Sequence, residues 1–126
     1  MNEKPFRVAD RLRSFTYAWA GLRTLLRSQH NAWIHAAATL LVIAAGACFR
    51  LAAGEWLWLV LAMTLVWTAE AFNTALELLA DAVTRERQPL IGQAKDVAAG
   101  AVLIAALGAL IIGGLVLGPH LLQRLR

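Results

Sequence analysis

The fold of this chain is decided by one stretch, Glu55-Trp-Leu-Trp-Leu-Val-Leu-Ala-Met-Thr-Leu-Val-Trp67-Thr-Ala-Glu70-Ala-Phe-Asn73-Thr-Ala-Leu-Glu77-Leu-Leu-Ala-Asp81. Residues 56–69 carry no charge, and neither Pro nor Gly interrupts the stretch, so it predicts one long helix that enters a bilayer. At about 100° per residue, Asn73, Glu77, Glu70 and Asp81 fall within roughly an 80° arc of that helix. A carboxylate in a bilayer costs several kcal/mol and normally marks a functional site, whereas polar seams between helices usually use Ser, Thr, Asn or Gln.

Composition predicts that the whole chain is one membrane domain. Of its 126 residues, 60% are hydrophobic and 16% are charged, which is too apolar for a soluble domain of this size. We therefore predict a single all-α integral membrane domain over residues 1–126. It has an amphipathic surface helix at about 6–28 and three transmembrane helices at about 32–49, 56–83 and 95–119. A tight turn over residues 50–55 and a charged loop over residues 84–93 connect the spans.

The surface helix is predicted from an apolar stripe. Its members recur at alternating steps of four and three residues: Val8, Leu12, Phe15, Trp19, Leu22 and Leu26. Arginines such as Arg11 and Arg23 flank the stripe, as expected for a helix lying in the membrane interface. Tyr17 lies on the opposite side, so its ring is expected to face water or a ligand.

The distribution of Lys and Arg predicts the orientation. Nine of these residues fall before the first span or between the second and third: Lys4, Arg7, Arg11, Arg13, Arg23, Arg27, Arg85, Arg87 and Lys95. The positive-inside rule therefore places the N-terminus and the second loop in the cytoplasm, at the inner membrane. The net charge of +4 requires no nucleic acid as partner, because basic residues are expected at an anionic membrane face.

The depth of the acidic face suggests its chemistry. If Glu55 marks the outer interface, the helix rise puts Glu70 about 21 Å inward, while Glu77 and Asp81 reach the cytoplasmic boundary. A lipid hydroxyl and a water-soluble nucleotide can meet there. Partial burial suits Glu70 to accepting a proton, the more solvated Glu77 can bind a hard cation, and Lys95 offers a charge for phosphate.

Small residues predict close helix packing in the third span. Ala101, Ala105, Ala109 and Gly113 fall four apart and form a ridge that another helix can approach closely. Three spans enclose little volume, so we expect other copies of the chain to be needed to bury the acidic face.

The chain resembles the prokaryotic diacylglycerol kinase family, which includes undecaprenol kinases. The resemblance covers nearly the whole chain and lies in these segments: Tyr17-Ala-Trp19-Ala-Gly21-Leu22-Arg23, Asn31-Ala-Trp-Ile-His35, Glu70-Ala-Phe-Asn73-Thr74-Ala-Leu-Glu77, Asp81, and Ala94-Lys95-Asp96-Val-Ala-Ala-Gly100. It implies a surface helix plus three transmembrane helices per chain, and a homotrimer with composite active sites at the cytoplasmic boundary. The family has neither a P-loop nor a protein-kinase signature, and neither motif occurs here.

The resemblance also implies roles for single residues. Glu70 matches the catalytic base that acts on the lipid hydroxyl, Glu77 a ligand of Mg²⁺ on the ATP phosphates, and Tyr17 a nucleotide contact. Further positions match the nucleotide and phosphate region or support the substrate: Trp19, Arg23, Asn73, Asp81, Glu86, Lys95 and Asp96.

Two positions depart from the family pattern. Gln29 stands where the family has a second metal-binding Glu, and its amide oxygen can still coordinate Mg²⁺ but brings no charge. Asp10 stands where an Arg touches ATP, so Arg11 is expected to take that place, with Arg7 and Arg13 as alternatives.

These observations predict a membrane lipid kinase that uses Mg²⁺ and ATP to phosphorylate a lipid alcohol. Diacylglycerol, which gives phosphatidic acid, is the first candidate substrate, and a polyprenol such as undecaprenol is the alternative. A small oligomeric channel or proton-coupled transporter is the competing class. A transporter site is expected near the midplane with polar partners on the outer side, and the outer halves of these spans have none.

Overall fold

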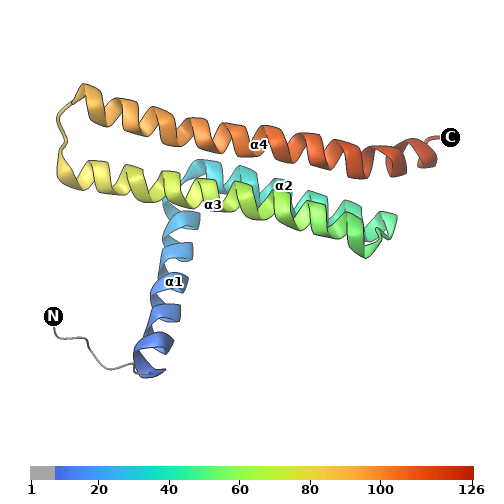
Figure 1. Ribbon diagram of the computed structural model, residues 1–126, viewed down its shortest axis with the longest axis horizontal. Coiled ribbons are helices and arrows are strands. Elements are labelled where there is room, and N and C mark those ends of the chain that lie inside the picture. The colour runs from blue at the N-terminus through green and yellow to red at the C-terminus, as the bar shows by residue number, and fades with distance from the viewer. Residues whose placement is uncertain (1–7) are drawn as a thin grey trace.

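The structure is a computed structural model that describes residues 8–126, apart from the side chains of Ala9, Asp10 and Ser28. The described chain is all-helical, as predicted, with α1 (Val8–Ser28), α2 (His30–Phe49), α3 (Ala53–Val83) and α4 (Pro89–Arg124) (Figure 1). Lys4, Arg7 and the first two residues of the predicted surface helix lie outside the described residues, as does the side chain of Asp10. Three of the helices, α2, α3 and α4, are long and apolar enough to cross a membrane.

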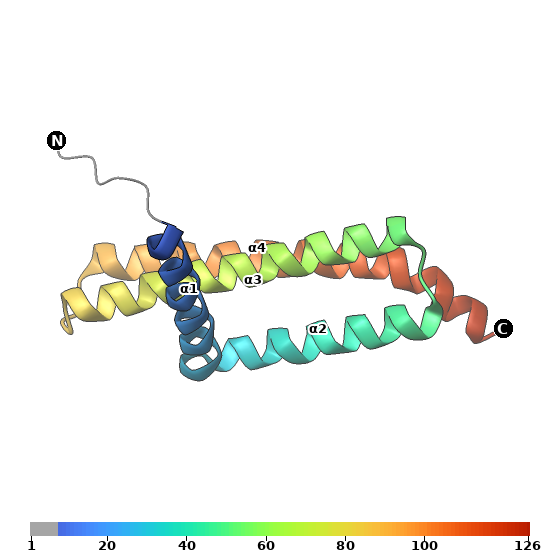
Figure 2. The same cartoon turned by 90° about the horizontal axis from the view of Figure 1, so that it is seen from below.

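The three long helices lie side by side and α1 crosses them. α3 and α4 form an antiparallel hairpin, and α2 runs along the same bundle, while α1 projects crosswise from it (Figure 1). The hairpin extends past α1 toward the α3–α4 loop, whereas α2 begins at the level of α1 (Figure 2). The C-terminal turns of α3 and the first turns of α4 therefore stand beyond the plane of α1.

Short turns set this arrangement. Gln29 is the single non-helical residue between α1 and α2, and its extended backbone (φ −121°, ψ 123°) redirects the chain. Arg50 ends α2 in the left-handed region (φ 54°), where the N–H of Leu51 donates to the Gly46 carbonyl at 3.1 Å. Ala52 has no side-chain acceptor to cap α3, but its own N–H donates to Glu55 Oε2 at 2.8 Å.

α4 is longer than the predicted span 95–119. It begins at Pro89, inside the stretch expected to be loop, and it continues through Pro119 to Arg124. Proline is favoured in the first turn of a helix, because its missing N–H has no intrahelical partner there. The apolar pattern identified only the part of α4 that suits a bilayer, and the helix extends beyond that part at both ends.

Polar side chains join the helix ends far from the α3–α4 loop. His120 Nε2 lies 2.7 Å from Glu55 Oε1, and the His120 ring stacks on Phe49 with centroids 5.8 Å apart. Arg124 donates to the Cys48 carbonyl at 2.8 Å and lies over the Phe49 ring. These contacts connect the ends of α2, α3 and α4 to one another.

The buried residues of the long helices are concentrated on one face of α3. Leu59, Ala62 and Val66 are buried there, and the same face continues with buried Glu70, Asn73 and Thr74. α4 has no buried residue, although most of it is apolar. Apolar helices exposed to this extent require cover from lipid or from other protein chains.

Candidate functional site

The face of α3 that carries Glu70, Asn73, Glu77 and Asp81 is buried at one end and exposed at the other. Glu70 is 0% exposed, whereas the Asp81 side chain, three turns further on, is 70% exposed. Glu77 lies between them and is half-buried. The expectation that burial of this face needs other copies of the chain is wrong for Glu70 and Asn73, because both are buried within a single chain.

Glu77 is held by two amide side chains. Gln29 Nε2 donates to Glu77 Oε2 at 2.8 Å, and Asn73 Nδ2 donates to Glu77 Oε1 at 3.2 Å. Asn73 precedes Glu77 by four residues, so helix periodicity already places the two together. Gln29 is 48 residues from Glu77 in the sequence, and it reaches Glu77 because the corner between α1 and α2 lies against this part of α3. The structure thus brings together the two residues predicted as metal ligands.

This donor set suits a metal ion that arrives with phosphates. Within residues 8–126 no group of three or more His, Cys, Asp or Glu side chains is arranged to hold a metal on its own. Mg²⁺ is usually held by one or two carboxylates together with substrate phosphates and water. Glu77 supplies one carboxylate, and Asn73 Oδ1 is a buried acceptor without a hydrogen-bond partner beside it. The residues therefore fit Mg²⁺ carried on a nucleotide.

Glu70 lies deeper, against His35 of α2. His35 Nε2 is 3.5 Å from Glu70 Oε2, and neither Glu70 oxygen has a hydrogen-bond partner within the described chain. The hydroxyl of Thr74, one turn further along α3, is likewise buried without a partner. A buried polar group without a partner costs about 1–3 kcal/mol, so these atoms favour a ligand that supplies one. Sequence reasoning assigned no role to His35, although it is the only titratable residue between His30 and Arg50 apart from Cys48.

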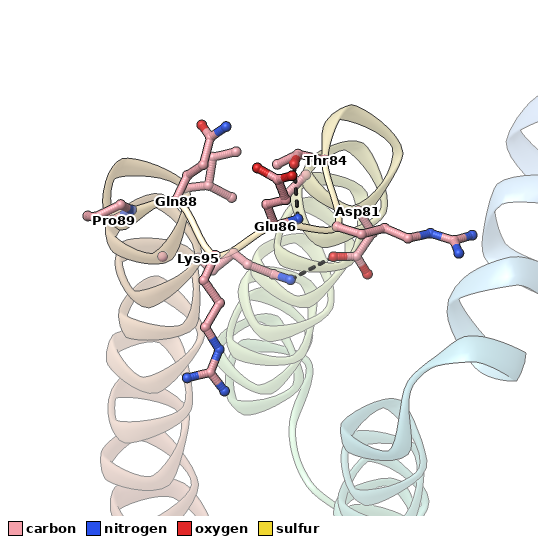
Figure 3. A pocket seen from close by; sticks show the side chains of 11 residues that line it. Asp81, Thr84, Glu86, Gln88, Pro89 and Lys95 are labelled. Atoms are coloured by element: carbon pink, nitrogen blue, oxygen red, sulfur yellow. Dashed lines mark hydrogen bonds and ion pairs between the residues drawn. The ribbon is translucent and has the colours of Figure 1, made fainter.

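A pocket of about 830 Å³ lies at the α3–α4 loop (Figure 3). Lys95 and Asp81 face each other across it, and their side chains form an ion pair with an Nζ–Oδ1 distance of 2.8 Å. Glu86 also lines it, and its backbone N–H donates to Thr84 Oγ1 at 3.0 Å. The pocket thus gathers three of the residues predicted for the nucleotide region. Its lining also contains two arginines that sequence reasoning used only for orientation, Arg85 and Arg87.

An apolar groove of about 590 Å³ lies between α1, α2 and α3. Trp19 and Arg23, both predicted to support the substrate, line it from α1 together with Trp67 of α3. Trp67 also contacts the His35 ring edge-on, with centroids 6.3 Å apart. Trp67 thus links the groove lining to His35, whose Nε2 lies 3.5 Å from Glu70 Oε2.

Other predicted residues stay apart from these features. Tyr17 is 73% exposed on α1 and lines neither the loop pocket nor the groove. Asp96 is exposed at the start of α4 and is not part of the pocket lining. Arg11 is exposed on α1, where it contacts other residues of the chain. Within the described residues, neither Tyr17 nor Asp96 hydrogen-bonds to Glu77, whose amide donors are Gln29 and Asn73.

Comparison with known proteins identifies the family. A model of the family described as prokaryotic diacylglycerol kinase matches residues 16–117. The chain belongs to this family. A diacylglycerol kinase of Synechocystis is 43% identical over 111 residues, which cover 87% of this chain and 63% of that protein. An undecaprenol kinase of Bacillus subtilis is 37% identical over 109 residues, covering 86% of this chain and 89% of that one.

The family also includes more distant relatives of this chain. The diacylglycerol kinase of Escherichia coli is 32% identical over 111 residues, which cover 82% of this chain and 85% of that protein. The matched region contains α2, α3 and most of α4, together with the α1 residues from Thr16 onward. Both lipid kinase names in the prediction therefore occur among these relatives, and none of the three is named as a channel or transporter.

Proposed function

We propose that this chain is a membrane lipid kinase that transfers the γ-phosphate of ATP to the hydroxyl of a lipid alcohol. The proposal rests on two carboxylates of α3. Glu70 is buried and accepts no hydrogen bond from the described residues, whereas Glu77 accepts hydrogen bonds from two amide side chains. An apolar groove lies on the side of Glu70, and a polar pocket lies beyond Glu77. A lipid and a nucleotide can therefore approach the same helix face from two directions.

In this proposal Glu70 is the base. Its oxygens accept no hydrogen bond from the described residues, so they can accept the proton of a lipid hydroxyl that enters from the groove. The acyl chains then lie against apolar and aromatic side chains such as Trp19 and Trp67. Arg23, the charged residue in the groove lining, remains at the polar end of the lipid.

Glu77 and the loop pocket hold the nucleotide. Glu77 and an amide oxygen of Asn73 or Gln29 would hold Mg²⁺, which neutralises phosphate charge during transfer. Seven residues separate Glu70 from Glu77, or about 10 Å along the helix, which leaves room for the γ-phosphate between them. Lys95 supplies a positive charge to the phosphates after its ion pair with Asp81 has broken.

We propose diacylglycerol as the first substrate and undecaprenol as the second. Support for diacylglycerol comes from the name of the 43% identical Synechocystis relative. Support for undecaprenol comes from the Bacillus subtilis relative, of which this chain covers 89%. Both lipids end in a hydroxyl on an apolar body, so the groove and Glu70 suit either one.

The same proposal places the chain in the inner membrane as a homotrimer, with the N-terminus and the α3–α4 loop in the cytoplasm. The crosswise direction of α1 and the exposure of its apolar residues, such as Phe15 at 74%, suit a helix lying in the interface (Figure 1). α4 has no buried residue and carries small residues such as Ala105 and Ala109, so it offers a face on which other copies can pack. A trimer would also let Tyr17, Arg11 or Asp96 of one copy approach Glu77 of another.

The test is a phosphorylation assay with γ-labelled ATP and Mg²⁺ against a panel of lipid alcohols in mixed micelles. We expect label in the lipid phase with diacylglycerol or undecaprenol, and the ratio of the two rates assigns the substrate. Glu70→Gln serves as the control that lacks the base. If the folded chain binds ATP and labels none of these lipids, the proposed function is wrong.

A further inference from the structure

His35 is the basic side chain that the fold places against the buried acid. It lies in the second turn of α2, and its Nε2 is 3.5 Å from Glu70 Oε2. The His35 side chain is 15% exposed while that of Glu70 is 0% exposed, so the imidazole is the wetter member of the pair. Neither Nε2 nor the Glu70 oxygens have a hydrogen-bond partner within the described chain.

Packing places the imidazole in this position. Trp67 meets the His35 ring at an interplanar angle of 67°, and its indole N–H donates to Thr39 Oγ1 at 3.0 Å. Thr39 follows His35 by one helical turn, and Trp67 precedes Glu70 by three residues, so each pair shares one face of its helix. The Trp67–Thr39 hydrogen bond therefore holds the two helices at the level where the histidine and the glutamate meet.

The burial of Glu70 creates a chemical problem that His35 can solve. A base that takes a proton from each lipid hydroxyl must lose that proton before the next turnover, and a fully buried carboxylate has no direct route to water. Few other charged groups lie at this level. Arg23 of α1 lines the groove beyond Trp67, and α4 has no titratable residue between Asp96 and His120.

We propose that His35 takes over the proton of Glu70 after each transfer, and this inference rests on the proposed role of Glu70 as base. The lipid oxygen forms a bond to the γ-phosphorus, and the bond from that phosphorus to the β–γ bridging oxygen breaks with its electron pair leaving on ADP. The hydroxyl proton moves to Glu70 and then to the Nε2 lone pair of neutral His35. The imidazolium then loses the proton on Nδ1 to water, and a flip of the ring turns a nitrogen lone pair back toward Glu70.

The chain supplies its own matched control. His120 and Glu55 form a second histidine–glutamate pair, with 2.7 Å between Nε2 and Oε1, at the opposite end of the bundle. It has the same two residue types, but it is hydrogen-bonded and more exposed, and neither residue lines the groove or the loop pocket. His120→Gln therefore measures how far the loss of a histidine–glutamate contact lowers the activity when no proton transfer is involved.

The experiment compares His35→Gln and His120→Gln in the lipid phosphorylation assay across a range of pH. We expect His35→Gln to lower kcat by roughly 10- to 100-fold while the KM for ATP stays within about twofold, because the lost step is proton transfer. The deficit should persist as the pH rises, since the buried Glu70 gives hydroxide no direct route to its proton. His120→Gln should keep both the kcat and the pH profile of the parent protein.

A second variant separates proton transfer from packing. His35→Ala leaves a gap that imidazole can enter, and we expect added imidazole to restore several-fold activity. Pyrazole has the same ring size but binds a proton only in strong acid, so it should restore none. Equal rescue by both rings, or a His35→Gln enzyme with the parent kcat and pH profile, overturns the proposal. If the unaltered chain phosphorylates no lipid alcohol, the proposed function fails instead.

Discussion

Gln29→Glu is the substitution that most directly tests the metal site. Gln29 Nε2 lies 2.8 Å from Glu77 Oε2, and glutamate has the same shape as glutamine, so the new carboxylate oxygen would take the place of that donor. The chain would lose a hydrogen bond to a charged group, worth about 1.5–3 kcal/mol. Two like charges about 4 Å apart would also repel each other by about 4 kcal/mol at an effective dielectric constant near 20. Without a metal, the variant should therefore be less stable than the parent.

Mg²⁺ reverses the sign of this effect. A divalent ion between residues 29 and 77 attracts both carboxylates, so the charge that destabilises the metal-free chain strengthens metal binding. We expect the Mg²⁺ concentration for half-maximal activity to fall by about tenfold, which corresponds to about 1.4 kcal/mol. Thermal unfolding should show the same coupling, with a lower Tm than the parent in chelator and a larger rise in Tm on addition of Mg²⁺ and nucleotide.

The assay is a Mg²⁺ titration read both by nucleotide binding and by lipid phosphorylation. Gln93→Glu is the matched control, because it adds the same charge near the α3–α4 loop at an exposed position outside the pocket lining. The control should leave the Mg²⁺ dependence unchanged. A folded, active Gln29→Glu enzyme with the parent's Mg²⁺ dependence would show that residue 29 lies outside the metal shell.

Three further substitutions test other parts of the molecule. Glu70→Gln should abolish phosphate transfer and leave ATP affinity nearly unchanged, and a loss of only a few-fold in kcat would reject Glu70 as the base. Glu77→Gln should weaken binding of ATP in the presence of Mg²⁺, and an unaltered nucleotide titration would remove Glu77 from the metal site. Gly46→Ala should lower the Tm, at a cost of about 1–3 kcal/mol, because its Cβ would lie 2.6 Å from the Trp56 ring. Gly54→Ala has no atom within 4 Å of the new Cβ and should not lower the Tm; an equal effect in both variants would contradict the packing argument.

Local patterns in the sequence were enough to predict the helices. A bilayer-length run without charge and a repeat of about 3.6 residues are properties of one segment, so they predicted three long apolar helices and the shared face of Glu70, Asn73 and Glu77. The same patterns missed the true start of α4 at Pro89. Pro89 and Gly92 in the first turns of that helix favoured a loop, although proline is well tolerated at the first position of a helix.

The sequence suggested a boundary between the surface helix and the first span, but it could not say what that corner would touch. Only the tertiary structure puts Gln29 against Glu77 across 48 residues of sequence. The resemblance to the family predicted that both residues serve one site. The hydrogen bond from Gln29 follows from the direction in which α1 leaves α2 and from the position of that corner along α3.

The pairing of His35 with Glu70 was likewise decided by tertiary structure alone. His35 and Glu70 are each a polar residue within an apolar segment, and the spacing of residues along either segment does not indicate that the two side chains meet. Their contact depends on the register and rotation of α2 against α3, which the Trp67–Thr39 hydrogen bond helps to fix. Sequence periodicity determines which face of a helix a residue occupies, because that is set by the local backbone geometry. The residue that faces it is set by packing between helices, which depends on all the side chains at the contact together.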